Sequence, residues 1–243
     1  IVGGSNPKYN LTFYTRLIKQ IKSIKPNIYI KAFTASEISY LSQLESISTY
    51  DTLNILKDAG INGITGGGAE ILNDEIRKEI CPHKINSQQW LEIHQQAHLI
   101  GLTSTCTMLY GHIETIDNRL EHLEALRNLQ DKTQGFQAFI PLKFKHFNNE
   151  LSYLKETNSI DDLKVFAISR IFLDNIKHIK AYWPAYGKDI AQMALRFGAD
   201  DIDGTISDST KIYSKAGADE QTPQMSIPEI IKLIEEVGYK AVE

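Results

Sequence analysis

Short runs of β-branched and aromatic residues alternate along this chain with longer segments in which apolar residues recur at helical spacing. The short runs predict strands, and the longer segments predict amphipathic helices. Regular alternation of the two is typical of a parallel sheet with crossover helices. The predicted strands cover residues 1–2, 28–33, 63–65, 103–109, 136–142, 178–183 and 201–202.

Capping residues mark where several of the predicted helices begin. Ser87 is expected to cap one helix, and Thr115 directly precedes another apolar stripe. Ser159 opens a third helix, whose first turn is acidic as the helix dipole favours. Ser226, followed closely by Pro228, begins the last helix, because proline is accommodated in a first turn.

The predicted strands, each followed by a turn and a helix, favour a TIM-type (β/α) barrel over an open doubly wound sheet. An eight-fold barrel needs one more unit before Ile1, so the first β/α unit is expected to be missing. No linker or shift in composition divides the chain, which predicts a single partial barrel domain over residues 1–243. Because an incomplete barrel exposes strand edges, we expect a homodimer, disorder nearby or poor stability.

Composition narrows the possible partners. The 243 residues carry a net charge of −4 with basic residues scattered throughout, so nucleic acid is not an expected partner. No apolar run approaches the roughly 20 residues of a membrane span, and no signal segment opens the chain, which predicts a cytoplasmic protein without membrane contact. Cys81 and Cys106 have no metal-site spacing, so reduced thiols are expected, with Cys106 in the core.

In a barrel of this kind the chemistry lies at the carboxyl ends of the strands. Two glycine-rich turns are predicted at that rim, which suits a cofactor with an extended polar body. The candidate rim residues are Gly3, Gly4, Asn6, Thr34, Glu37, Gly66, Gly67, Gly68, Glu70, Tyr110, Gly111, His112, Lys143, Tyr182, Trp183, Asp203 and Thr205.

Several candidates also have a purely structural interpretation. His112 follows a glycine in a turn, where a local hydrogen bond is the alternative to a functional role. Glu70 could simply complement a helix dipole, and Arg170 could form a salt bridge on its helix. His94 and His98 are four residues apart on one predicted helix, and without an acidic third ligand we expect them to pair at the surface.

Seven longer motifs resemble the aminodeoxyfutalosine synthases, radical S-adenosylmethionine (SAM) enzymes of the futalosine route to menaquinone. The resemblance spans essentially the whole chain. Dehypoxanthine futalosine cyclase and the H subunit of deazaflavin (FO) synthase share several of the motifs, but Lys-Ala-Tyr-Trp and Gly-Ala-Asp-Asp-Ile-Asp-Gly-Thr favour the first family. The motifs cover residues 31–38, 66–71, 107–115, 135–142, 173–175, 178–183 and 197–205.

The resemblance implies a radical SAM barrel in which a 4Fe-4S cluster, fed by an electron donor protein, cleaves SAM. The 5′-deoxyadenosyl radical then adds to 3-[(1-carboxyvinyl)oxy]benzoate. It also implies that Gly3 and Gly4 meet the methionyl amino group, and that the glycine run with Glu70 lies near the ribose and methionyl part of SAM. For the substrate carboxylates, the expected partners are Thr34, His112 and Arg170.

The chain departs from that family in one respect. Radical SAM enzymes hold their cluster with a CxxxCxxC loop, which this sequence lacks, and Cys81 and Cys106 cannot replace it. No metal ligand is therefore expected in this chain, which we interpret as an N-terminally truncated, inactive part of a longer enzyme. The alternatives are the cyclase, the deazaflavin enzyme, or a cluster-free barrel that only binds a nucleotide or a partner.

Overall fold

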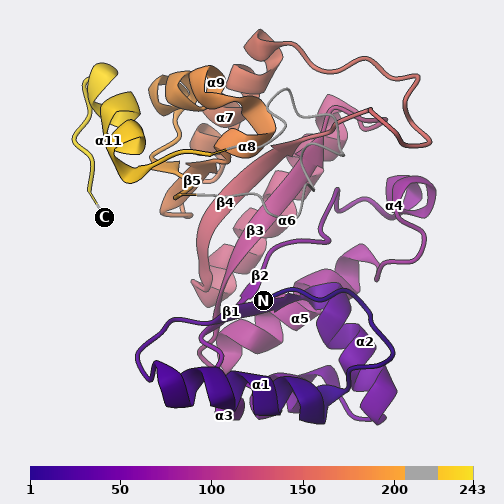
Figure 1. Ribbon diagram of the computed structural model, residues 1–243. Coiled ribbons are helices and arrows are strands. Elements are labelled where there is room, and N and C mark those ends of the chain that lie inside the picture. Colours follow the sequence, from indigo (N-terminus) through magenta and orange to yellow (C-terminus); the bar gives the residue numbers. More distant parts are fainter. Residues whose placement is uncertain (206–223, 243) are drawn as a thin grey trace. The chain divides into compact units, whose positions relative to one another are not determined.

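The computed structural model describes residues 1–205 and 224–242 (Figure 1). Its strands form a six-stranded sheet in which the spatial order of the strands is their order along the chain, and the recorded strand pairs are parallel. Helices follow the strands, as in (β/α) barrels, which confirms the predicted fold class. The strands are β1 (Lys31–Thr34), β2 (Gly63–Thr65), β3 (Thr103–Tyr110), β4 (Phe136–Lys143), β5 (His178–Ala181) and β6 (Asp201–Ile202).

Most helices begin with a side-chain cap. The predicted starts near Thr115, Ser159 and Ser226 are confirmed, whereas the helix predicted from Ser87 is capped one residue earlier by Asn86. A single 3₁₀ turn covers Leu195–Phe197. The described helices are α1 (Leu11–Ile24), α2 (Ala35–Glu45), α3 (Thr49–Ala59), α4 (Asp74–Ile80), α5 (Ser87–Leu99), α6 (Ile116–Thr133), α7 (Ser159–Phe172), α8 (Trp183–Tyr186), α9 (Lys188–Ala194) and α11 (Ile227–Glu236).

The strand predicted at residues 1–2 is not formed as such. Ile1 nevertheless donates its amine to the carbonyl of Lys31 at 2.7 Å and accepts from the amide of Phe33 at 2.8 Å. These are the two bonds with which a parallel strand would pair with Ala32. The segment therefore lies in strand position beside β1, but only one residue makes this pairing before the chain turns at the glycines.

The chain divides into two compact units. The first comprises residues 1–107 and 124–137 and the second comprises residues 108–123 and 138–243. Whether they act as one domain stays a prediction. In the first unit, α1, α2, α3 and α5 pack against one another (Figure 1), and their inward side chains, among them Ile18, Leu53 and Trp90, are fully buried.

The second unit has its own core. Helix α7 packs against α9 and β5, and α9 also contacts β5, so that Phe166, Ile179 and Trp183 are almost entirely buried. No helix in the described part of the chain is long and apolar enough to cross a membrane. Both cysteines belong to the first unit and are buried, which confirms the expected core position of Cys106.

Candidate functional site

The Gly3–Gly4 turn is held by a buried carboxylate of the first unit. The amides of Gly3 and Gly4 both donate to Oε1 of Glu37, at 2.7 and 2.8 Å. Glu37 is only 6% exposed. Gly4 has a positive φ of 64°, and no atom lies within 4 Å of the position that a Cβ would take there. The amides of this turn are therefore held by Glu37, while the space beside Gly4 is open. A ligand that binds main-chain atoms needs such open space.

The position of Glu37 follows from the start of α2. Thr34 ends β1 and caps the helix: its hydroxyl accepts from the amide of Glu37 at 3.2 Å. In return, Oε2 of Glu37 accepts from the amide and the hydroxyl of Thr34, at 2.8 and 3.0 Å. This capping box fixes the side chain of Glu37 within its own helix. The predicted candidate Thr34 thus uses its hydroxyl in the cap.

Gly66 has no side chain because β3 lies against it. A Cβ there would lie 2.5 Å from the carbonyl oxygen of Thr105 and 2.6 Å from the Cα of Cys106. The amide of Gly66 donates to the hydroxyl of Thr105 at 3.1 Å, and its carbonyl accepts from the hydroxyl of Thr107 at 2.7 Å. The neighbouring strand therefore accounts for this glycine without a ligand.

The rest of the glycine run faces α2. A Cβ at Gly67 would lie 3.2 Å from Cγ2 of Thr34, and one at Gly68 would lie 3.2 Å from Oγ of Ser36. The two glycine turns consequently meet at the amino end of one helix. The structure thus brings four of the predicted cofactor residues, Gly3, Gly4, Gly67 and Gly68, close to Thr34, which was predicted as a substrate residue.

Arg77 of α4 fixes the backbone of this loop through hydrogen bonds, a role that the sequence did not suggest. Its side chain is 4% exposed, and its guanidinium donates to the carbonyls of Gly68, Ala69, Ile71 and Ile85. An arginine is suited to this task because its five donors are fixed in one plane.

Glu70 lies in a strained conformation at the end of the same loop. Its φ is +45°, a left-handed value that a non-glycine residue adopts rarely and at a cost. The carboxylate bonds to Lys84, and the side chain is only 18% exposed. Strain of this kind is common at ligand sites, so Glu70 stays a candidate.

His112 lies in the second unit, in the turn after β3. Its Nδ1 is 3.0 Å from Oε2 of Glu114, and its Nε2 is 3.1 Å from the carbonyl of Leu109. Glu114 is fully buried and also accepts from the amides of Gly111 and His112, at 2.6 and 2.8 Å, and from Arg119 at 2.6 Å. Glu114 therefore orients the imidazole, and its role was not foreseen from the sequence.

Arg170 lies away from the carboxyl ends of the strands. Near the end of α7, its guanidinium donates to the carbonyls of Gly198 and Ile176, at 2.9 and 3.2 Å, and to Oδ1 of Asp200 at 2.8 Å. Ile176 and Asp200 precede β5 and β6, so these contacts lie at the amino ends of the strands. The arrangement matches the salt-bridge alternative for Arg170.

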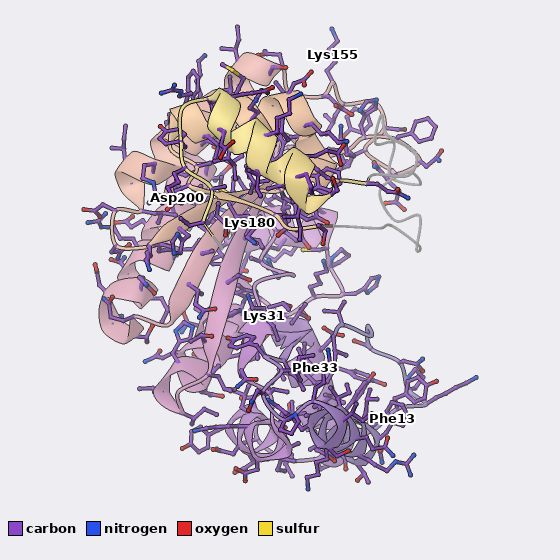
Figure 2. All side chains as sticks on the ribbon, turned by 60° about the vertical axis from the view of Figure 1, so that its left-hand side comes forward. Phe13, Lys31, Phe33, Lys155, Lys180 and Asp200 are labelled. Atoms are coloured by element: carbon purple, nitrogen blue, oxygen red, sulfur yellow. The ribbon has the colours of Figure 1, made fainter. Side chains whose placement is uncertain are left out.

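Two further ion pairs involve Lys180 of β5, which is labelled in Figure 2. Its Nζ lies 3.4 Å from Oδ2 of Asp201 in β6 and 2.8 Å from Oδ1 of Asp203 directly after β6. Burial raises the pKa of Asp201, although Lys180 acts in the opposite direction. These pairs hold the last strand of the described sheet in place.

A buried polar cluster lies at the carboxyl end of β3 and β4 in the second unit. Asp162 of α7, 2% exposed, accepts from the hydroxyls of Tyr110 and Thr157, at 2.8 and 2.6 Å, and from Nζ of Lys143 at 3.0 Å. Burial, followed by the nearby Tyr186, raises the pKa of Tyr110 far above its ordinary value. Both Tyr110 and Lys143 were rim candidates, and the structure shows that Asp162 joins them.

The expectation of surface pairing for His94 and His98 is wrong. Both side chains are buried in the first unit and share the hydroxyl of Ser104, which lies 3.0 Å from Nδ1 of His94 and 2.8 Å from Nε2 of His98. His94 also lies against Trp90, with ring centroids 3.8 Å apart. The histidines belong to the core.

The residues of this chain do not fit a 4Fe-4S cluster. Such a cluster takes thiolate ligands, and the sequence has two cysteines, both buried, the thiol of Cys106 with its pKa raised by burial. Among the described residues, no group of three or more His, Cys, Asp or Glu side chains could hold a metal ion. We therefore assign no cluster to this chain.

Comparison with known proteins identifies the group to which the chain is related. Residues 133–241 match the family model described as the CofH/MqnC C-terminal region. The whole chain is 39% identical to aminodeoxyfutalosine synthase of Thermus thermophilus, of which it covers 66%. The chain belongs to the CofH/MqnC family of radical SAM proteins.

Other relatives of the chain are named for different activities. The chain is 39% identical to 5-amino-6-(D-ribitylamino)uracil–L-tyrosine 4-hydroxyphenyl transferase of Methanothermobacter thermautotrophicus, over 98% of this chain and 66% of that protein. It is 37% identical to cyclic dehypoxanthine futalosine synthase of Streptomyces coelicolor, over 97% of this chain and 58% of that protein. The chain thus spans about two thirds or less of the length of these curated relatives.

The fold of this CofH/MqnC member also matches a solved structure. Methylornithine synthase (PylB) superposes with a TM-score of 0.73 at 14% identity, over the whole of this chain and 67% of PylB. This likeness supports the barrel architecture and carries no argument about the reaction.

Proposed function

We propose that this chain supplies the SAM-binding and substrate-binding part of a radical SAM aminodeoxyfutalosine synthase. The reaction joins the 5′-deoxyadenosyl group of SAM to the enol-ether double bond of 3-[(1-carboxyvinyl)oxy]benzoate, in menaquinone biosynthesis. The observation that carries the proposal is the meeting of two glycine turns at the amino end of α2. The 39% identity to two aminodeoxyfutalosine synthases supports it.

In this proposal four residues contact SAM, namely Gly3, Gly4, Gly68 and Glu70. Gly3 and Gly4 would meet its aminoacyl part through the open backbone of their turn. The loop that ends at Gly68 would carry the ribose, with the carboxylate of Glu70 as acceptor for the ribose hydroxyls. Gly66 and Gly67 support that loop, because their contacts with β3 and α2 set its path.

The substrate residues are assigned in the same way. His112 is proposed to act only through the turn after β3, because its Nδ1 lies 3.0 Å from Oε2 of Glu114, its Nε2 lies 3.1 Å from the carbonyl of Leu109, and its side chain is fully buried. Thr34 is proposed to act through the turn that it helps to fix, because its hydroxyl is engaged with Glu37. Arg170 is left out of the proposed site, since its contacts lie at the amino ends of β5 and β6.

Direct binding of SAM tests the proposal without requiring turnover. Equilibrium dialysis of the chain against radiolabelled SAM should show saturable binding. Replacement of Glu70 by Gln should raise the dissociation constant by about tenfold, the loss of one charge-assisted hydrogen bond. Glu75→Gln is the matched control, because Glu75 is exposed and forms a surface ion pair with Lys78. No saturable binding by the unaltered chain would overturn the proposed cofactor role.

A second candidate function has equal sequence support. The Methanothermobacter relative is as similar as the synthases, and its name specifies L-tyrosine as a substrate. A thermal-shift experiment distinguishes the two functions. The melting temperature of the chain is measured with SAM and either 3-[(1-carboxyvinyl)oxy]benzoate or L-tyrosine, and the true substrate should raise it. Stabilisation by tyrosine alone would replace the synthase proposal, and stabilisation by neither would favour a barrel that only binds the nucleotide.

A further inference from the structure

Glu37 connects the Gly3–Gly4 turn to the start of α2 through both of its carboxylate oxygens. Oε1 takes the two glycine amides and Oε2 takes the amide and hydroxyl of Thr34. The two ends of this link are 34 residues apart in sequence. A carboxylate that accepts several hydrogen bonds is held in a fixed position.

This link also determines where the carbonyl groups of the turn point. In a trans peptide the N–H and the preceding C=O point in opposite directions, and the chain has no cis peptide among its described residues. Because the amides of Gly3 and Gly4 are drawn to Glu37, the carbonyls of Val2 and Gly3 are directed to the opposite side. Two adjacent carbonyl oxygens on one side are acceptors suited to an ammonium group.

We propose that Glu37 is a positioning residue for the cofactor, a role that rests on the proposed function. By holding the amides of Gly3 and Gly4, Glu37 presents the carbonyls of Val2 and Gly3 to the ammonium group in the aminoacyl part of SAM. Glu37 itself does not touch the reacting atoms. Its effect is confined to the part of the ligand that carries the amine, and the nucleoside part is bound elsewhere.

Glutamine cannot take over this role. An amide has one acceptor oxygen, and its NH₂ group can only donate. If the oxygen of the substituted side chain took the glycine amides, the NH₂ would face the amide of Thr34, and the reverse orientation would place it against Gly3 and Gly4. Glu37→Gln therefore breaks one of the two anchors with almost no change in side-chain volume.

Glu45, at the end of the same helix, offers a matched control. Its Oε1 accepts one hydrogen bond, from the amide of Leu11 at 3.0 Å. Because a glutamine oxygen can accept that single bond, Glu45→Gln preserves the contact. The pair of variants thus applies the same chemical change to a two-sided anchor and to a one-sided anchor on α2.

The test compares two ligands that differ in the aminoacyl part. SAM carries the ammonium group, whereas 5′-methylthioadenosine has the nucleoside without it. For Glu37→Gln we expect the dissociation constant of SAM to rise by about tenfold or more, with that of 5′-methylthioadenosine unchanged. Glu45→Gln should leave both constants unchanged. Unaltered SAM binding in Glu37→Gln, or an equal loss for both ligands, would overturn the positioning role.

A second measurement separates this inference from the proposed function. If the unaltered chain binds neither ligand, the proposed function fails, and hydrogen exchange of the peptide that contains Gly3 and Gly4 decides the role of Glu37. Faster exchange in Glu37→Gln than in Glu45→Gln supports Glu37 as the residue that holds the turn. Equal exchange in the two variants shows that the turn does not depend on Glu37 and overturns the inference.

Discussion

The buried pair His94 and His98 makes the stability of the first unit dependent on pH. The hydroxyl of Thr133 donates to the carbonyl of Leu129 at 2.9 Å, so its oxygen accepts from Nδ1 of His98 at 2.7 Å. Nε2 of a neutral His98 then accepts from the hydroxyl of Ser104, whose oxygen accepts from Nδ1 of a neutral His94. Each bond of this chain therefore has a donor and an acceptor with both imidazoles uncharged.

The cost of protonation follows from burial. Burial lowers the pKa of His98 from 6.5 to about 4, and burial together with His98 lowers the pKa of His94 well below its ordinary value. Since the unfolded chain binds the proton more readily, stability is fully present above about pH 6.5 and is lost as the pH falls toward 4. For His98 alone, the loss between about pH 7 and about pH 5 is about 2 kcal/mol.

Urea unfolding followed by tryptophan fluorescence measures this loss. The chain has two tryptophans, and Trp183→Phe leaves Trp90, which stacks on His94 and reports on the first unit. In this background, His98→Gln should remove about 2 kcal/mol of the dependence on pH, because glutamine does not titrate. The exposed His83, changed to Gln, is the control. An identical loss of stability in His98→Gln and in the parent would refute the reasoning.

Two further substitutions test packing and charge in the two units. Gly135→Ala places a Cβ 2.1 Å from Cγ of His98 and should cost about 3 kcal/mol in thermal unfolding, whereas Gly204→Ala, with no atom within 4 Å, should change nothing; equal melting temperatures would contradict this. Asp162→Asn should cost about 3 kcal/mol, because it removes the charge nearest to the half-buried Lys143 and leaves Glu156, at 3.5 Å, as its ionic partner. Adding Lys143→Met should restore part of that loss, which chemical denaturation of the single and double variants would show.

The strand pattern was readable from the sequence because β-branched runs are a strong local signal. The predicted bounds of β2 and β6 agree with the structure. The strand predicted over residues 178–183 ends earlier, at Ala181, because Trp183 and Pro184 begin α8 and proline suits a first helical turn. The helix predicted from Ser87 is capped by Asn86, because Asn86 and Gln89 have the three-residue spacing of a capping box.

The candidate site was only partly readable. The capping box of Thr34 and Glu37 is a local pattern, but nothing local links Glu37 to the Gly3–Gly4 turn. The burial of His94 and His98 carried a signal, because they follow the apolar Trp90 by four and eight residues and so share its face of the helix. The buried face of α5 thus includes polar side chains as well as apolar ones, because the histidines form hydrogen bonds inside the core.

The glycine run shows why a glycine motif needs a separate physical test at each position. Gly66 is required by the backbone of β3, and Gly68 has a φ of +83°, so both would be glycine even if no ligand bound. Gly67 has an ordinary φ and approaches only the methyl group of Thr34, at 3.2 Å from its Cβ position. A cofactor therefore does not explain the run as a whole. The positive φ of Gly4 likewise requires glycine without a ligand, but the space beside Gly4 is open, so its backbone is accessible to one.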